Sequence, residues 1–210
     1  MHSTSVGACS PRELLVTDAQ SCALCTRMRD SRRVLTDRNG NWNAKVLFVA
    51  EAPGRLGAEV TGVPLFGDRT GDRFERLLEA MEWDRSMVFI TNAVLCNPRD
   101  AEGNNDKPLR AEIGNCSGFL RRTLDVVDPV LVIALGRVAL EALGAIHAHE
   151  CTIGEHSGTA VPWGGRYLGL LYHPSPRTQA QRKWDQQIAD ARSLARFARQ
   201  QLGIGPMISG

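Results

Sequence analysis

The chain has 210 residues, of which 43% are hydrophobic and 23% are charged, and its formal net charge is +2. These values are typical of one globular domain with a sizeable core, and so small a net charge does not by itself indicate a nucleic-acid-binding protein. No apolar run approaches the roughly 20 residues that cross a bilayer, which excludes a membrane-spanning helix. We expect one domain over residues 1–210, with its core at about 20–202, short mobile termini and a monomeric state.

The N-terminal residues MHSTSVGACSPRELL lack the basic and then apolar layout of a secretory signal. A cytoplasmic location without a membrane partner is therefore the expectation. In that reducing compartment the six cysteines are thiols or metal ligands rather than disulfides. Arginines gather in residues 27–38 and 177–199, and such local basic stripes matter for DNA binding even where the total charge is small.

Four short apolar runs predict buried parallel strands. Each run is rich in β-branched or large apolar residues and shows no clean alternation, as expected where helices cover both faces of a sheet. The runs are residues 45–50, 87–92, 130–135 and 167–172.

Helical periodicity lies between and after these runs. Phe74, Leu77, Leu78 and Met81 recur at the spacing of one helical face. The other predicted helices cover residues 113–127, 137–143 and 188–202, and residues 97–109 predict a polar loop. Strands that alternate with helices predict an α/β fold, a three-layer α/β/α sandwich around a four-stranded, mainly parallel sheet.

Polar groups follow three of the four predicted strands: Glu51, Asn92 and His173. In open α/β sheets, ligands bind just beyond the carboxyl ends of the strands. Each residue alone has a simpler interpretation, because Glu51 and Asn92 could cap a helix or a turn and His173 could be a hydrogen-bonded core residue. The three together make this edge of the sheet the candidate site.

Four of the six cysteines have a spacing that suits a metal centre. Cys22 and Cys25 form a C-x-x-C pair, whereas 19 residues separate Cys96 from Cys116. Four thiolates hold either a tetrahedral zinc ion or a [4Fe–4S] cluster, and the wide second spacing modestly favours the cluster. Burial of Cys96 and Cys116 as small apolar residues is the simpler alternative. The two cysteines expected to have no ligand role are Cys9 and Cys151.

Several short motifs follow one another in order between residues 22 and 177. Besides the four candidate cysteines they are AEAPG at 50–54, GVPLFG at 62–67, TNAVLC at 91–96, IALG at 133–136 and HPSP at 173–176. The ordered set resembles the uracil-DNA glycosylase superfamily, and most closely its iron–sulfur-containing branch. FGDRTGD and HPSPR are also similar to the broader-specificity branch. The resemblance implies a [4Fe–4S] cluster on the four cysteines.

The resemblance also implies roles for the strand-end groups. Glu51 would position and activate a water that attacks the sugar, and Asn92 would read the edge of uracil through its amide. His173 would donate a hydrogen bond to the charge that develops on the uracil oxygen. The loop after residue 54 is one residue longer than the family pattern, so Glu59 is a second candidate for the water-positioning acid.

Five further residues complete the expected substrate site. Leu65 stands where the family pattern has an aromatic residue, and Phe66, one position later, is the expected platform for the flipped base. Ser175 would clamp phosphates, and Arg177 would either enter the gap left in the duplex or pair with a phosphate. Ala52 stands where some relatives exclude thymine with a bulky residue, which motivates the hypothesis that hypoxanthine and xanthine also enter.

These roles imply a monofunctional DNA repair glycosylase that flips uracil out of DNA and hydrolyses its N-glycosidic bond, leaving an abasic site. Its partner would be DNA that contains uracil or another deaminated base. The cluster would hold the N-terminal segment against the polar loop and place Arg27 and Arg29 near DNA. Two alternatives stay open: a cluster-stabilised DNA-binding module with lost or altered catalysis, and a hydrolase of free nucleosides.

Overall fold

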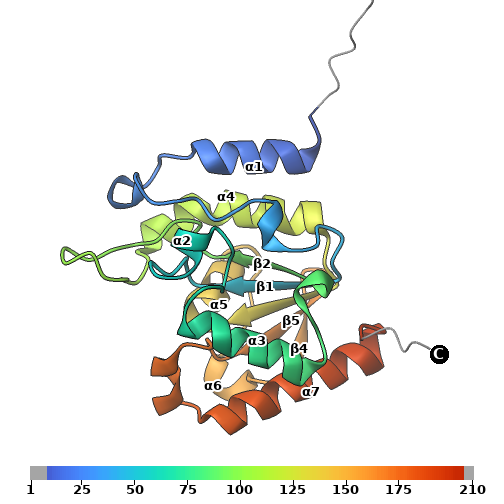
Figure 1. Cartoon of the computed structure of the whole chain (residues 1–210). Coiled ribbons are helices and arrows are strands. Elements are labelled where there is room, and N and C mark those ends of the chain that lie inside the picture. Colours follow the sequence, from blue (N-terminus) through green and yellow to red (C-terminus); the bar gives the residue numbers. More distant parts are fainter. Residues whose placement is uncertain (1–8, 206–210) are drawn as a thin grey trace, which may run out of the picture.

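Five strands form one sheet in a computed structural model that describes residues 9–205 (Figure 1). The strand order is β2-β1-β3-β5-β4, in which the first four strands are parallel and β4 pairs antiparallel with β5 at the edge. The strands are β1 (Val46–Ala50), β2 (Val88–Asn92), β3 (Leu131–Leu135), β4 (Ala160–Trp163) and β5 (Arg166–Leu171).

Helices lie on both faces of this sheet. The α-helices are α1 (Pro11–Ser21), α2 (Ala58–Thr61), α3 (Arg69–Met81), α4 (Arg110–Val127), α5 (Arg137–Gly144), α6 (Ile153–His156) and α7 (Trp184–Leu202). Short 3₁₀ turns are η1 (Thr26–Met28), η2 (Asp37–Asn39), η3 (Arg85–Met87) and η4 (Pro176–Ala180).

The sheet separates two apolar cores because successive side chains of a strand point to opposite faces. In β1, Phe48 packs with α3 and α7, whereas Leu47 and Val49 pack with α4 and α5. Helix α1 packs on the outside of α4, as Figure 1 shows. The expected three-layer α/β/α architecture is confirmed, with α1 added beyond the second helical layer.

The sequence did not predict the edge strand β4, the helix α1 or the short helices α2 and α6. The sheet has five strands instead of four because β4 is a short edge strand that contains Pro162, and a proline is tolerated at an edge. The Gly164-Gly165 turn between β4 and β5, with φ of +53° and +79°, is the hairpin signal that could have revealed it. Helix α1 begins with a Ser10 capping box and buries only Leu15 and Ala19, so its apolar periodicity is weak.

The expectation of mobile termini falls largely on residues 1–8 and 206–210, which lie outside the described residues. Between residues 9 and 205, no helix combines the length and the apolar character needed to cross a bilayer.

Parallel pairing brings the ends of β1, β2, β3 and β5 to one edge of the sheet. Gly136, directly after β3, has φ +88° and ψ 179°, a backbone conformation that is essentially restricted to glycine. A Cβ atom there would lie 3.0 Å from the Cβ of His173. Gly136 therefore allows the segment after β5 to pass close to the end of β3.

Candidate active site

Asn92 ends β2 beside Ala50 of β1 and is only 2% exposed. Among the described residues its side-chain Nδ2 has no hydrogen-bond partner. A buried donor without a partner costs about 1–3 kcal/mol, so such a group is a candidate for binding a ligand. An asparagine amide both donates and accepts, which suits the edge of a pyrimidine base.

Glu51 follows β1 directly and is partly buried. Burial raises the pKa of its carboxyl group, with Lys107 opposing and Asp106 reinforcing that shift. A carboxylate with a raised pKa is a better proton acceptor at neutral pH. By contrast, Glu59 accepts a hydrogen bond from Arg99 at 2.7 Å and is already paired. The structure thus leaves Glu51 the freer of the two candidate acids.

His173 lies just beyond β5, where its Nδ1 accepts a hydrogen bond of 3.3 Å from the backbone N–H of Ser175. By surface area His173 is partly exposed, yet protein atoms surround it densely enough that desolvation lowers its pKa to about 4. The imidazole is therefore neutral at pH 7. With Nδ1 acting as the acceptor, the proton resides on Nε2, which remains available as a donor.

Asp68 lies at the candidate site, although the sequence motifs assigned it no role. Its Oδ1 caps α3 by accepting from the backbone N–H groups of Thr70 and Gly71. Its Oδ2 would lie 2.5 Å from a Cβ at Gly57, so the carboxylate fits against the turn that follows Glu51. Electrostatic attraction to Asp68 also raises the pKa of His173 and opposes desolvation. The signal was present as the aspartate of FGDRTGD, three residues before a glycine.

The two candidate base platforms have different surroundings. Leu65 has φ +50° and is 8% exposed, with its side chain in the core formed with α3. Phe66 is 48% exposed, and the guanidinium of Arg85 lies 5.5 Å from its ring centroid. Arg85 also donates to the carbonyl oxygens of Pro64 and Leu65, at 3.1 and 2.6 Å. Arg85 therefore fixes the strained turn that directs Phe66 outward.

The remaining predicted substrate contacts lie near His173 or next to Glu51. The hydroxyl of Ser175 is 3.0 Å from that of Thr178. Arg177 is exposed at the start of η4, and no salt bridge to it is found in the described part of the chain. Ala52 is partly buried and packs against the core on the α4 and α5 side.

The four candidate metal ligands line one small cavity, together with Arg33 and Asn115. Arg33 donates to the carbonyl oxygen of Cys22 at 2.6 and 3.0 Å, and Asn115 Nδ2 donates to the Sγ of Cys25 at 3.4 Å. In residues 9–205, no three cysteine, histidine or acidic groups are close enough to hold a single metal ion. The four candidate ligands are Cys22, Cys25, Cys96 and Cys116, while Cys9 and Cys151 lie outside the cavity.

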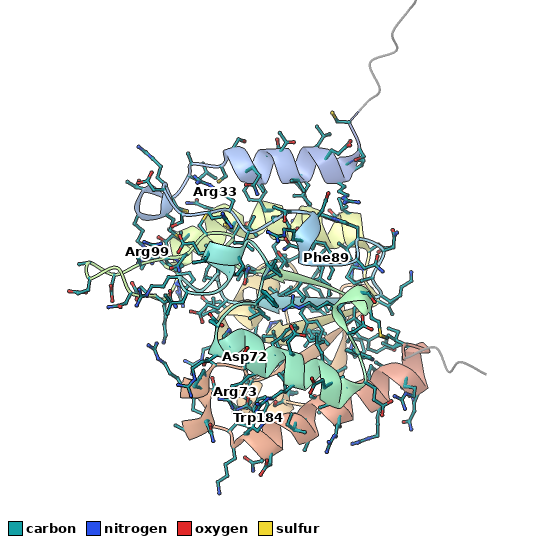
Figure 2. All side chains as sticks on the ribbon, viewed as in Figure 1. Arg33, Asp72, Arg73, Phe89, Arg99 and Trp184 are labelled. Atoms are coloured by element: carbon teal, nitrogen blue, oxygen red, sulfur yellow. The ribbon has the colours of Figure 1, made fainter. Side chains whose placement is uncertain are left out.

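Arg27 does not face outward toward DNA, contrary to the expectation from the sequence. It forms ion pairs with Glu112 at 2.6 Å and Asp106 at 2.7 Å, and it donates to the carbonyl oxygen of Lys107 at 2.8 Å. The segment after Cys25 therefore holds the polar loop 97–109 in place. Lys107 of this loop is close enough to Glu51 for its positive charge to lower the pKa of that carboxyl group. Figure 2 shows Arg99 on this loop and Arg33 beside the N-terminal segment.

Comparison with known proteins identifies the family of the chain. The family model described as "Uracil DNA glycosylase superfamily" matches residues 38–197. The chain belongs to the uracil-DNA glycosylase superfamily. A type-4 uracil-DNA glycosylase of Saccharolobus solfataricus is 33% identical over 169 residues, which cover 78% of this chain and 75% of that protein.

Two other relatives extend the comparison across the named types. A type-4 uracil-DNA glycosylase of Thermotoga maritima is 29% identical, and the match covers 78% of this chain and 81% of that protein. A type-5 uracil-DNA glycosylase of Thermus thermophilus is 31% identical, with 78% and 87% covered. The superfamily indicated by the ordered motifs is thereby confirmed.

Replacing Arg27 with glutamine should lower the free energy of unfolding by about 2–3 kcal/mol, somewhat less than for a fully buried pair, because Glu112 would lose its partner. Hydrogen bonding to Arg27 lowers the pKa of Glu112. The contribution is therefore present above the usual carboxyl pKa and is lost as the pH falls through the lowered one. Urea unfolding at pH 7 and in acid measures both effects.

Arg110→Gln is the matched control, because Arg110 is 94% exposed and lies 3.5 Å from Glu141. It should change the free energy of unfolding by no more than about 1 kcal/mol. Equal losses of unfolding free energy in the two variants would show that the ion pairs of Arg27 do not stabilise the fold more than an exposed pair does.

His173 should make the folded state less stable in mild acid. The unfolded chain protonates this side chain near its usual pKa of about 6.5, whereas the folded state resists protonation until about pH 4. The free energy of unfolding therefore falls between these values, by at most about 1.4 kcal/mol per pH unit. Urea unfolding of His173→Gln should show a shallower decline with falling pH; a decline identical to that of the wild type would refute the assignment.

Proposed function

We propose that this protein is a monofunctional DNA repair glycosylase that hydrolyses the N-glycosidic bond of uracil flipped out of DNA. The observation that carries the proposal is the buried amide of Asn92, whose Nδ2 has no partner among the described residues. It lies at the same sheet edge as Glu51 and His173. Family membership and the names of the curated relatives support the same substrate.

The base enters the site after leaving the helix stack, which costs a few kcal/mol for a paired base and less for a mismatched one. Asn92 donates through Nδ2 to one uracil carbonyl oxygen and accepts through Oδ1 from the ring N–H. Cytosine presents the opposite donor and acceptor pattern on this edge, so a fixed amide rejects it. The exposed ring of Phe66 is the proposed apolar platform, because Leu65 is buried in the core.

Bond cleavage places positive charge on the sugar and negative charge on the leaving base. Glu51 orients a water molecule and accepts a proton from it as the water oxygen bonds to the anomeric carbon. The negative charge of Glu51 also stabilises the positive charge on the sugar. The electron pair of the broken N-glycosidic bond goes to the base. His173 donates from Nε2 to the resulting oxyanion, and a donor of this kind is worth about 2.7–4 kcal/mol of barrier.

Neutral His173 is suited to this role. Because its pKa is lowered to about 4, the imidazole is uncharged at neutral pH. It therefore stabilises the oxyanion by donating a hydrogen bond and not by carrying a positive charge. The backbone N–H of Ser175 holds the required tautomer through Nδ1. Ser175 and Arg177, next along the chain, are proposed to contact the phosphates that flank the flipped nucleotide.

A [4Fe–4S] cluster on the four cysteines is part of the proposal. The fit is supported by four thiols around one cavity, by the cation of Arg33, and by the amide of Asn115 directed at a sulfur. N–H groups and positive charge beside cysteine sulfurs are common in such centres. The cluster would supply a cross-link between the N-terminal segment and the chain around residues 96–116. The reducing cytoplasm is the compartment we propose for this thiol-rich protein.

Uracil excision tests the function directly. We expect a labelled duplex with one uracil to be cut at that position after treatment with the protein and then with alkali. Glu51→Gln should slow excision by about 10²–10⁴-fold, and His173→Gln by about 10²–10³-fold. Duplexes with hypoxanthine, xanthine or thymine in place of uracil measure how far Ala52 widens the substrate range.

Glu79→Gln is the control, since Glu79 is an exposed residue of α3. It should excise uracil at the wild-type rate, and Glu59→Gln should lose far less than Glu51→Gln because Glu59 is paired with Arg99. No cleavage by the wild type, with binding of uracil-containing DNA intact, would favour the DNA-binding module with lost catalysis.

The cluster has its own readout. The purified protein should be brown, with a broad absorbance near ~400 nm and about four iron and four sulfide per chain. Cys96→Ser should lose the absorbance, whereas Cys151→Ser should keep it because Cys151 lies outside the cavity. Stoichiometric zinc in a colourless protein would support the tetrahedral zinc alternative instead.

A further inference from the structure

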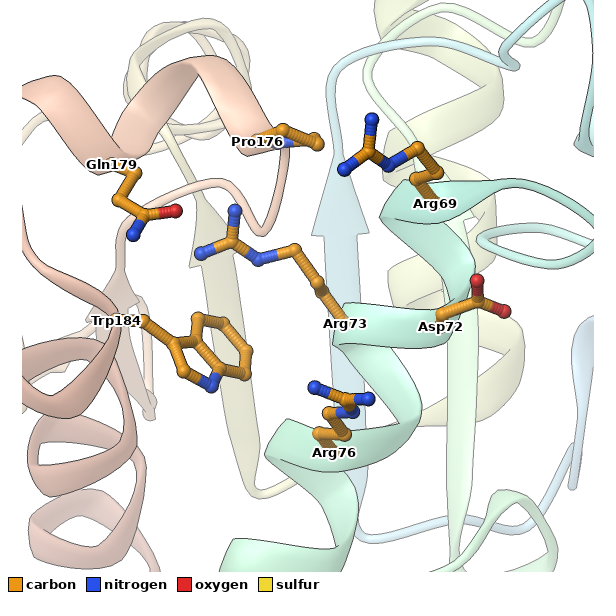
Figure 3. A pocket seen from close by; sticks show the side chains of 7 residues that line it. All are labelled: Arg69, Asp72, Arg73, Arg76, Pro176, Gln179 and Trp184. Carbon is orange, nitrogen blue, oxygen red and sulfur yellow. The ribbon is translucent and has the colours of Figure 1, made fainter.

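A second cavity, of about 310 Å³, lies between α3, η4 and the start of α7 (Figure 3). Three arginines from one side of α3 reach it, at positions i, i+4 and i+7. Pro176, Gln179 and Trp184 form the opposite wall in Figure 3. The lining residues are Arg69, Asp72, Arg73, Arg76, Pro176, Gln179 and Trp184. Arg69 lies within FGDRTGD, and the sequence motifs assign no role to any of the three arginines.

The positive charge of this cavity is largely uncompensated. Within residues 9–205, Arg69, Arg73 and Arg76 form no salt bridge, and Asp72 is the one acid in the lining. The Nη2 atom of Arg73 is fully buried and lacks a hydrogen-bond partner in the same part of the chain. Desolvation, together with repulsion from Arg69 and Arg76, lowers the pKa of Arg73. A bound anion would relieve both costs.

Arg73 is held in place on its other sides. Its guanidinium lies over the ring of Trp184, 4.2 Å from the centroid, and its Nη1 donates to the carbonyl oxygen of Ser175 at 3.3 Å. Figure 3 shows the guanidinium of Arg73 beside the indole ring of Trp184. A guanidinium that is stacked and oriented in this way is pre-organised for forked recognition of an oxyanion.

The position of the cavity indicates where its anion comes from. Ser175, which Arg73 contacts, also donates to His173, so one short segment separates the cavity from the proposed active site. Arg69 lies in the first turn of α3, next to Asp68 at the carboxyl edge of the sheet, whereas Arg76 lies about 10 Å further along the helix axis. The row of arginines therefore begins at the edge of the sheet where DNA would bind and continues along α3.

We propose that this cavity binds one phosphodiester group of the DNA strand that flanks the flipped nucleotide. This inference rests on the proposed function for its ligand. Arginine forks match phosphate geometry. The three arginines outnumber the one carboxylate of Asp72 in the lining, and the surplus of positive charge suits a single phosphate. Phosphate binding would hold Arg73 against the carbonyl oxygen of Ser175. Bound phosphate would thus fix the position of the segment that carries His173 when a DNA strand is bound.

The test measures binding of a fluorescent duplex without uracil at several salt concentrations. A protein that loses one phosphate contact should lose about 0.9 from the slope of log K against log[salt]. We expect this change in the double variant Arg69→Gln/Arg76→Gln. The control Lys45→Gln/Arg121→Gln removes the same charge from exposed positions outside both arginine-rich stretches and should keep the wild-type slope. Equal slopes in all proteins, or equal losses in both doubles, would overturn the proposal.

Two further measurements complete the test. Arg73→Gln should lower the slope like the double variant, and Arg73→Lys should recover part of it because lysine keeps the charge but not the fork. Inorganic phosphate alone should stabilise the wild type to heat more than the double variant. Stabilisation by phosphate with an unchanged DNA slope would assign the cavity to a free phosphate compound and overturn the DNA assignment.

The uracil-free duplex keeps this result separate from the proposed function. If the protein excises no uracil while the slopes differ as expected, the enzymatic proposal fails and the phosphate site stands. If excision is normal while the slopes agree, only the phosphate site fails.

Discussion

The parallel pairing of β1 with both β2 and β3 is the constraint on which the site depends. Because the strands run in the same direction, Asn92 and Glu51 come to one edge although 40 residues separate them in sequence. Pairing of β3 with β5 brings His173 to the same edge. These strands are buried along most of their length, so a slip in register would move apolar side chains out of both cores. The apolar packing of the sheet thereby fixes the relative positions of three polar groups.

Desolvation sets the chemistry of these groups. Asn92 is buried with an unpaired donor, Glu51 has a raised pKa, and His173 has a lowered one. The unpaired donor and the desolvated carboxylate cost stability in the folded protein, and the apolar cores on both faces of the sheet compensate for it. The raised pKa makes Glu51 a better proton acceptor, and the lowered pKa keeps His173 neutral. Both states suit a reaction in which the sugar and the leaving base become charged in the transition state.

Arginines join segments that the sheet does not connect. Arg27 ties the segment after Cys25 to the loop that carries Lys107, and Arg85 holds the turn at Leu65 and Phe66. Arg73 connects α3 to the segment after His173. Arg27 and Arg85 pair with carboxylates, whereas Arg73 has no salt-bridge partner within residues 9–205. That difference is the physical reason to assign an external anion to Arg73.

The sequence by itself determined the four parallel strands, the principal helices and the edge at which the candidate site lies. These features are local, because a run such as residues 46–50 or the stripe from Phe74 to Met81 records which side chains are buried. The tertiary structure alone decided that Arg27 turns inward, that Glu59 is paired, and that Asp68 reaches the turn after Glu51. Such contacts join residues far apart in the chain, and their charge pairing depends on packing that no local pattern encodes.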